Sequence, residues 1–230
     1  FPGIVIVVAP DETGNIKTIA DLAGKTVGVS APGSSTDFFL KYLLGKAGQA
    51  PDSAAVVGVG LGATAVAAIE QGQIDAVVTL DPAVTVLQNR HPELRLLADT
   101  RSALDTEALF GSSYPGGALY TLQTWIDEHP EAVQGMAAAI TDTLDYIHSH
   151  TPEEIMAQMP AEMIGAEKEA YLAALTSSIP MYSETGLMDP KGAETVLAVF
   201  SAGSPDVAAA NIDLSRTYTN AFVEKARAGQ

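Results

Sequence analysis

The sequence predicts an α/β fold with a mainly parallel sheet. Short runs of β-branched residues alternate with longer stretches of helical periodicity, which is typical of repeated strand–helix units. Ile74–Leu80 is apolar except for Asp75 and Thr79, as expected for a central strand covered on both faces. A chain of 230 residues that is 47% hydrophobic can bury a core of this kind.

The remaining strands are expected at short apolar runs bounded by turn-forming residues. The last of them is expected to be an edge strand. In chain order these runs are Ile4–Val8, Thr26–Ser30, Ala55–Val59 and Leu94–Ala98.

Several helix starts are predicted by a hydroxyl residue followed three positions later by an acidic one, which together form a capping box. In the N-terminal half, Thr18 with Asp21 predicts a short helix that ends near Gly24, and Ser34 with Asp37 predicts a longer one. Later helices are expected at Pro130–His150, from Thr151-Pro152-Glu153-Glu154 onward, at Pro190–Phe200 and at Ser215–Arg227.

The character of the chain changes at Gly111–Tyr120, where turn formers combine with a short apolar run. We interpret this segment as a hinge that contains a short strand. Residues 10–115 are expected to form a complete α/β lobe. Residues 1–9 and 116–230 are expected to supply hinge strands and the helical part of a second lobe. Because that helical part contains scarcely any strand, its helices need either a sheet from upstream of Phe1 or a place on the first lobe.

Charge and cysteine content exclude several classes of function. The chain has 12 basic and 28 acidic residues, and its net charge of −16 would repel nucleic acid and anionic lipid. It has no cysteine, which excludes disulfides, thiolate metal sites and a cysteine nucleophile. Ile4–Val8 is too short to span a bilayer and follows no basic segment, so it is expected to be a strand and not a signal peptide.

The first candidate site is the hydroxyl cluster Ser34, Ser35 and Thr36, at the start of a helix that follows a strand. Free backbone N–H groups and the helix dipole favour an anion there, and hydroxyls add further donors. Ligands of open α/β sheets bind beyond the carboxyl ends of the strands, which is where this cluster falls. Ordinary helix capping would also account for these residue types.

The second candidate site is the glycine-rich turn Gly58–Ala63. It formally fits a dinucleotide-binding pattern, but a complete strand–helix pair precedes it, whereas that pattern opens the first unit of its fold. We therefore expect a tight turn whose backbone amides, at Gly62 and Ala63, face a shared cleft.

Two further side chains are candidates for ligand contact. Asp81 ends the predicted central strand and could accept a hydrogen bond from a ligand, although it could equally cap the helix after Pro82. Tyr114 and Tyr120 lie in the predicted hinge and could line a cleft.

We find no positive case for an enzyme, a cofactor or a metal site. His148 and His150 lie close together near the end of a predicted helix, but no second group of ligands completes a metal site. Ser34 has neither the nucleophile-elbow motif nor an identifiable base.

Two stretches carry a family resemblance: Asp21–Thr36, which reads DLAGKTVGVSAPGSST, and Ala67–Ala76, which reads AAIEQGQIDA. They resemble the nitrate/sulfonate/taurine (NMT1/SsuA-like) family of ABC-transporter periplasmic substrate-binding proteins, a grouping that includes receptors for thiamine precursors. The resemblance runs over nearly the whole chain. It implies a type II periplasmic-binding fold, with two lobes joined by a hinge that close on the ligand. Family members carry a segment ahead of the region that matches Phe1, so we expect the N-terminal part of one lobe to be missing.

The resemblance also implies a function. It predicts a periplasmic or extracytoplasmic receptor, sometimes tethered to the membrane, that binds a small organic anion and delivers it to an ABC permease. Ser34, Ser35 and Thr36 match the anion-binding helix start, Gly62 and Ala63 the second amide site, and Asp81 the strand-end contact. A receptor for a pyrimidine or thiamine precursor, or the effector domain of a transcription regulator, remains an alternative. The related pyrimidine synthases depend on cysteines that this chain lacks.

Overall fold

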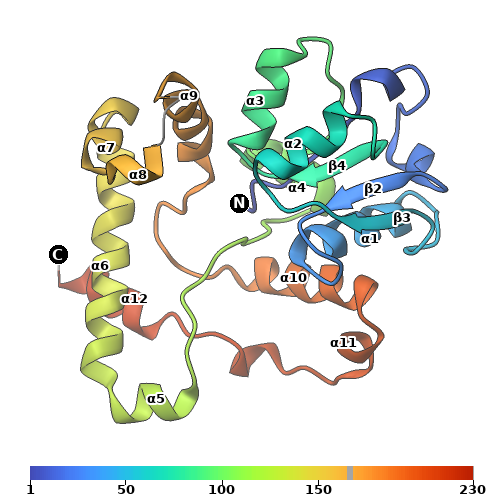
Figure 1. Ribbon diagram of the computed structural model, residues 1–230. Coiled ribbons are helices and arrows are strands. Elements are labelled where there is room, and N and C mark those ends of the chain that lie inside the picture. The colour runs from blue at the N-terminus through green and yellow to red at the C-terminus, as the bar shows by residue number, and fades with distance from the viewer. Residues whose placement is uncertain (165–167, 230) are drawn as a thin grey trace.

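All five strands seen in the computed structural model lie before residue 100 (Figure 1). The structure describes residues 1–164 and 168–229. The strands form one sheet in the order β3-β2-β4-β1-β5, which confirms the predicted α/β class and the edge position of the last strand. Their bounds are β1 Val5–Val8, β2 Thr26–Val29, β3 Ala55–Gly58, β4 Ala76–Thr79 and β5 Leu96–Asp99.

Strand β1 occupies a different place from the one expected for it. Residues 1–9 are expected to supply a hinge strand outside the lobe of residues 10–115, but β1 lies between β4 and β5 and is antiparallel to both. The pairs β2–β3 and β2–β4 are parallel, as predicted. Residues 10–115 therefore do not complete the sheet without β1. The boundaries of the two lobes remain a prediction.

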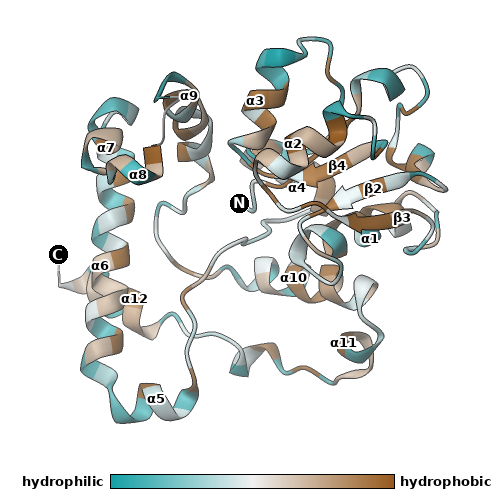
Figure 2. Ribbon diagram, in the orientation of Figure 1, coloured by the Kyte–Doolittle hydropathy of each residue, from teal (hydrophilic) through white to brown (hydrophobic). Residues whose placement is uncertain are grey.

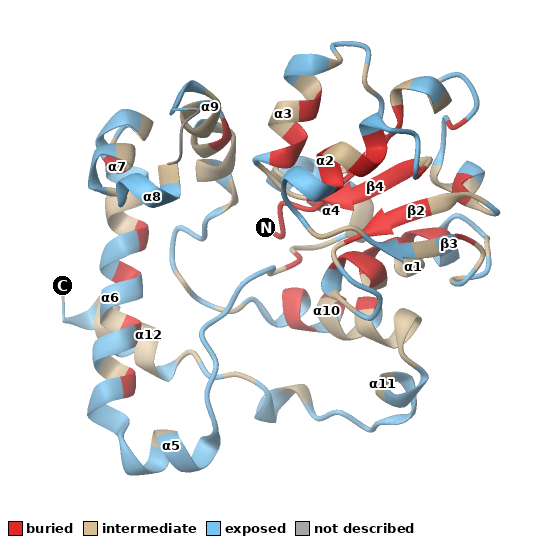
Figure 3. Ribbon diagram, in the orientation of Figure 1, coloured by how far each residue is buried: buried red, intermediate tan, exposed pale blue. Residues whose placement is uncertain are grey.

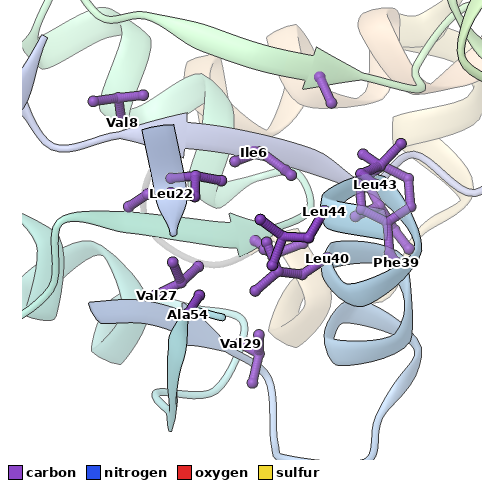
Figure 4. Close-up of a cluster of buried hydrophobic side chains, with 14 of the residues drawn as sticks. Ile6, Val8, Leu22, Val27, Val29, Phe39, Leu40, Leu43, Leu44 and Ala54 are labelled. Carbon is purple, nitrogen blue, oxygen red and sulfur yellow. The ribbon is translucent and has the colours of Figure 1, made fainter. Parts of the chain in front are cut away.

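Each face of the sheet carries its own hydrophobic core. One core includes Ile6 and Val8 of β1 and the other includes Val5 and Val7, all four fully buried. This alternation follows from the period of a strand, whose successive side chains point to opposite faces. Figure 4 shows the first core, in which Leu40 and Leu44 of a helix face Ile6 and Val27. Figure 2 shows the hydrophobic residues along the strands, and Figure 3 shows β2 and β4 as buried.

Helices cover both faces of this sheet. Helix α1 (Ser35–Lys46) packs on the first core, while α2 (Ala63–Glu70) and α3 (Ala83–Arg90) pack on the second. Helix α4 (Ala103–Phe110) follows β5, and its Phe110 ring lies 4.7 Å from the ring of Tyr114.

The C-terminal half is helical, as predicted, and its described residues contain no strand. Most of its helices stand apart from the sheet in a second body (Figure 1), where α5 and α7 are largely exposed (Figure 3). This body contains α5 Gln123–Glu128, α6 Pro130–Ser149, α7 Pro152–Gln158, α8 Ala161–Ile164, α9 Lys168–Ser178 and α12 Ala221–Ala228.

The C-terminal half contacts the first lobe mainly through one helix. Helix α10 (Pro190–Gly203), followed by α11 (Pro205–Ala209), crosses α1, where the rings of Phe38 and Phe200 are 4.9 Å apart. Part of the helical layer therefore does pack on the first lobe, one of the two arrangements expected for it.

Two predicted elements differ from the structure. The short strand expected within Gly111–Tyr120 is extended chain, because no strand among the described residues pairs with it. The last helix begins at Ala221, well after the predicted Ser215. Its start is delayed because the side chain of Asn220 exchanges two hydrogen bonds with the backbone of Met188, at 2.9 and 3.0 Å.

Replacing Gly203 with alanine should weaken the contact between α10 and α1. A Cβ atom at Gly203 would lie 2.3 Å from Cδ1 of Phe38, so the aromatic pair would have to move. We expect Gly203→Ala to lower the free energy of unfolding by about 1–3 kcal/mol, the usual cost of overpacking. Urea denaturation followed by circular dichroism measures this change.

Gly135→Ala is the matched control, because a Cβ atom at this position in α6 would meet nothing within 4 Å. We expect it to raise stability by about 0.5–1 kcal/mol through helix propensity. Equal effects of the two substitutions would contradict the proposed role of Gly203.

Candidate functional site

The candidate site lies at one edge of the sheet. Strands β2, β3 and β4 are parallel, and β4 and β5 are both antiparallel to β1, so the carboxyl ends of β2–β5 share one edge. The starts of α1 and α2, Asp81 and the chain after β5 all follow these strand ends. This is the edge at which open α/β sheets bind ligands.

The hydroxyls at the start of α1 mostly bond one another. Ser34 Oγ lies 2.8 Å from both Ser30 Oγ and Thr36 Oγ1, and the two latter atoms are 3.0 Å apart. Thr36 Oγ1 also accepts from the backbone N–H of Ser30 at 2.9 Å, and Thr36 is buried. The hydroxyls of Ser34 and Thr36 therefore hold the turn together, and Ser35 is the one of the three that faces a cavity.

Asp37 does not form the predicted capping box with Ser34. Its Oδ2 accepts from the backbone N–H of Gly33 at 2.7 Å and lies 3.5 Å from Nζ of Lys41. The side chain is 3% exposed, and Oδ1 has no hydrogen-bond partner among the described residues. A buried carboxylate thus already lies in the first turn of α1, where it interacts with the positive end of the helix dipole.

The start of α2 has the tight turn that the glycines predicted. Gly60 has φ of 74°, and a Cβ atom there would lie 2.9 Å from Oγ1 of Thr64, so the turn favours glycine. Gly62 is the N-cap residue of α2, and the amides of Gly62 and Ala63 donate to no acceptor among the described residues. Neither residue lines the cavity that Ser35 faces, so the two amide sites do not meet there.

Asp81 is engaged within the protein. Its Oδ1 accepts from the backbone N–H and the hydroxyl of Thr85, at 2.9 and 2.6 Å, so it caps α3 as in the simpler of the two interpretations. Its Oδ2 lies 3.2 Å from Nη1 of Arg101, and the two side chains are only 5% and 15% exposed.

Arg101 is a residue that sequence reasoning missed. It also bonds both carboxylate oxygens of Asp99, with Nη2 2.6 Å from Oδ2, and this hydrogen bond raises the pKa of the Arg101 guanidinium. Arg101 thus joins the carboxyl ends of β4 and β5. No local pattern predicts this pairing, because it depends on two strands that are neighbours only through β1.

A cavity of about 480 Å³ opens beside this edge. Of the predicted site residues it brings together Ser35 and Tyr114; Ser34, Thr36, Gly62, Ala63 and Asp81 do not line it. Its other walls come from the N-terminal residues, the hinge, α10 and the chain after α11. The lining residues are Pro2, Ile4, Ser35, Leu80, Tyr114, Pro115, Gly116, Gly117, Ala118, Met188, Ala193, Val196, Leu197, Phe200, Val207, Ile212, Leu214, Thr217 and Tyr218.

The two tyrosines of the hinge differ in their surroundings. Tyr114 is 3% exposed, and burial raises the pKa of its hydroxyl to about 12. Tyr120 is 92% exposed and does not line the cavity. Tyr114 therefore presents a neutral phenol at the cavity wall at physiological pH.

The residues of α10 that line the cavity were also missed as site residues. Ala193, Val196, Leu197 and Phe200 recur at intervals of three and four, which predicts an amphipathic helix. That periodicity could have identified a buried face, but it does not say what the face packs against.

The described residues hold no group of three or more His, Cys, Asp or Glu side chains that could bind a metal ion. His148 Nε2 lies 3.3 Å from the carbonyl oxygen of Ser183, and the ring of His150 stacks on Tyr146 at 3.7 Å. Within residues 1–164 and 168–229, no helix has the length and apolar character needed to cross a membrane.

Comparison with known proteins identifies one family. The family described as NMT1/THI5 like matches residues 3–155. A Brucella abortus (strain 2308) protein, named only as a candidate binding protein, is 31% identical over 138 residues, which are 60% of this chain and 40% of that protein. The match therefore spans well under half the length of this relative.

Solved structures share the fold. A structure from Bordetella bronchiseptica RB50 has a TM-score of 0.89 at 33% identity, covering 99% of this chain and 71% of that one. A periplasmic sulfonate-binding protein SsuA from Methylobacillus flagellatus KT has a TM-score of 0.69 at 18% identity, covering 98% and 66%. The alkanesulfonate-binding protein SsuA from Xanthomonas axonopodis pv. citri, bound to MOPS, has a TM-score of 0.59 at 19% identity, covering 88% and 65%. The chain has the α/β fold of these periplasmic binding proteins.

Removing the charge of Arg101 should destabilise the fold through Asp81. Arg101→Gln leaves the buried Asp81 carboxylate without its ion pair, and we expect the free energy of unfolding to fall by about 1–3 kcal/mol. Urea denaturation measures this loss. Arg95→Gln, at an exposed position, should change stability by less than about 0.5 kcal/mol. A loss as small for Arg101→Gln would show that the pair contributes little.

The buried Tyr114 should make the protein sensitive to alkaline pH. Its folded pKa, about 12, exceeds the unfolded value of roughly 10, so its contribution to stability is complete below about pH 10. That contribution should be lost as the pH rises from about 10 through 12. The difference in ultraviolet absorbance between the wild type and Tyr114→Phe isolates this titration. An isolated transition near pH 10 would contradict the burial of Tyr114.

Proposed function

Because the chain belongs to the NMT1/THI5-like family, we propose that it is the solute-binding protein of an ABC importer, acts outside the cytoplasmic membrane and binds a small organic anion. The family is one of binding proteins, and the chain shares its fold with sulfonate-binding proteins of the periplasm. In this role the protein performs no covalent chemistry: it captures a solute and presents it to a permease.

The observation that carries this proposal is the cavity where the first lobe meets the hinge and α10. It is lined by Ser35 from the start of α1, by Tyr114 from the hinge and by residues of the C-terminal half. A cavity of about 480 Å³ is within the usual range for sites that enclose a small molecule. A solute held there touches segments far apart in the chain, which is how a solute favours a closed arrangement.

The start of α1 supports an anionic head group. The amides of Ser35 and Thr36 donate to no acceptor among the described residues, and the Ser35 hydroxyl adds a donor at the cavity. The N-terminus of α1 favours negative charge, although the buried Asp37 carboxylate in its first turn already interacts with the positive end of the helix dipole. These donors suit a head group with one negative charge, such as a sulfonate or a carboxylate.

Isothermal titration of the purified protein with sulfonates, carboxylates, nitrate and pyrimidines tests the proposal. We expect saturable binding of at least one sulfonate or carboxylate. If none of these compounds binds, a role as a receptor for small organic anions is contradicted, and binding of pyrimidines alone would instead favour a receptor for a pyrimidine precursor.

Substitutions of the neighbouring Ser34 and Ser35 distinguish a hydroxyl that contacts the ligand from one that only holds the turn. Ser35→Ala should weaken binding about two- to tenfold, the effect of losing one hydrogen bond to the anion. Ser34→Ala should weaken binding less than Ser35→Ala does, because Ser34 does not line the cavity and its bonds to Ser30 and Thr36 only order the turn. Titration of both variants with the same anion measures the difference, and equal affinities would remove Ser35 from the site.

A further inference from the structure

The cavity wall is almost entirely apolar. Four of its side chains carry a hydroxyl, namely those of Ser35, Tyr114, Thr217 and Tyr218, and none of the lining side chains is acidic, basic or histidine. A ligand of the size of nitrate or acetate would leave most of this wall in contact with water. The wall therefore matches a molecule with a substantial apolar part.

Helix α10 supplies the largest apolar surface of the cavity. Val196, Leu197 and Phe200 line it and are half-buried, and Val196 also packs against the first hydrophobic core, where Val199 is fully buried and does not line the cavity. The three half-buried side chains thus form a stripe on the cavity side of α10. Each apolar group that a ligand buries against this stripe adds affinity in proportion to its area.

The charges around the cavity limit the ligand to one negative charge. Several carboxylates directly adjoin lining residues in the chain: Asp81 beside Leu80 is buried and paired with Arg101, whereas Asp189, Asp206 and Asp213, beside Met188, Val207 and Leu214, are exposed. No lysine or arginine lines the cavity, and the whole chain carries a net charge of −16. A second negative charge placed against the apolar stripe would lose its hydration without gaining a partner.

We propose that the solute is a monovalent organic acid with an extended apolar body, held against Val196, Leu197 and Phe200, and that these residues determine specificity. This inference rests on the proposed function and narrows it to a class of substrate. It separates such acids from inorganic anions, from very short acids and from acids with a second charge at the far end.

Three compounds of equal chain length, together with a shorter acid, test this proposal by calorimetric titration of the purified protein. From acetate to hexanoate we expect affinity to rise about fourfold for each added methylene. Adipate, which adds a second carboxylate to the six-carbon chain, should bind roughly tenfold or more weakly than hexanoate. Hexan-1-ol keeps the chain but lacks the charge.

The outcomes separate this inference from the proposed function. Equal affinities for acetate and hexanoate, or tighter binding of adipate, would overturn the apolar-body proposal while leaving an anion receptor in place. If hexan-1-ol binds as tightly as hexanoate, both the proposal that the solute is a monovalent acid and the proposed role as an anion receptor are contradicted. If none of the four compounds binds, the apolar-body proposal and the anion-receptor function are both contradicted.

A pair of variants locates the apolar contact. Leu197→Asn places an amide in the stripe, and we expect hexanoate to bind about tenfold more weakly while acetate is unaffected. Leu104→Asn is the control, because Leu104 lies on α4, is 77% exposed and does not line the cavity. Circular dichroism checks that both variants fold. An unchanged ratio of hexanoate to acetate affinity in Leu197→Asn would contradict the role of α10.

Discussion

The burial of β1 on both faces is the constraint on which the rest of the structure depends. Its four residues are fully buried and alternate between the two hydrophobic cores. Because β1 separates β4 from β5, it also sets the distance that Arg101 spans between Asp81 and Asp99. Ile4 directly precedes β1, and its carbonyl accepts hydrogen bonds from both the amide and the hydroxyl of Thr100, which follows β5. The strand thus ties the N-terminal residues of the cavity to the sheet edge.

At that edge, the protein's own side chains already use donors and hydroxyls around the start of α1 that the proposed ligand would otherwise contact. Asp37 takes the amide of Gly33, and Ser34 and Thr36 bond each other. Such bonds preorganise the turn and lower the cost of ordering it when a ligand binds. They also leave few free donors, so hydrogen bonds alone supply limited affinity. Under the proposed function, the apolar wall of the cavity then contributes a large part of the binding free energy.

The sequence predicted local features well and long-range ones poorly. The five strands before residue 100, the capping boxes at Thr18 and Thr151 and the start of α10 at Pro190 depend on residues close in the chain, and the structure contains all of them. The direction of β1 could not be predicted, because an alternation that is apolar on both faces looks the same in either orientation. The partner of Asp81 was missed for a related reason, since Arg101 is brought beside it only by the order of the strands.

The cavity could not be predicted from the sequence, although helix α10, which lines it, could. The start signal at Pro190 identified this helix, yet its partner α1 lies far earlier in the chain. Phe200 both packs against Phe38 of α1 and lines the cavity. A solute that contacts Phe200 therefore acts on the same contact that joins the C-terminal half to the first lobe. Binding and the packing of α10 are linked through one side chain, so each stabilises the other.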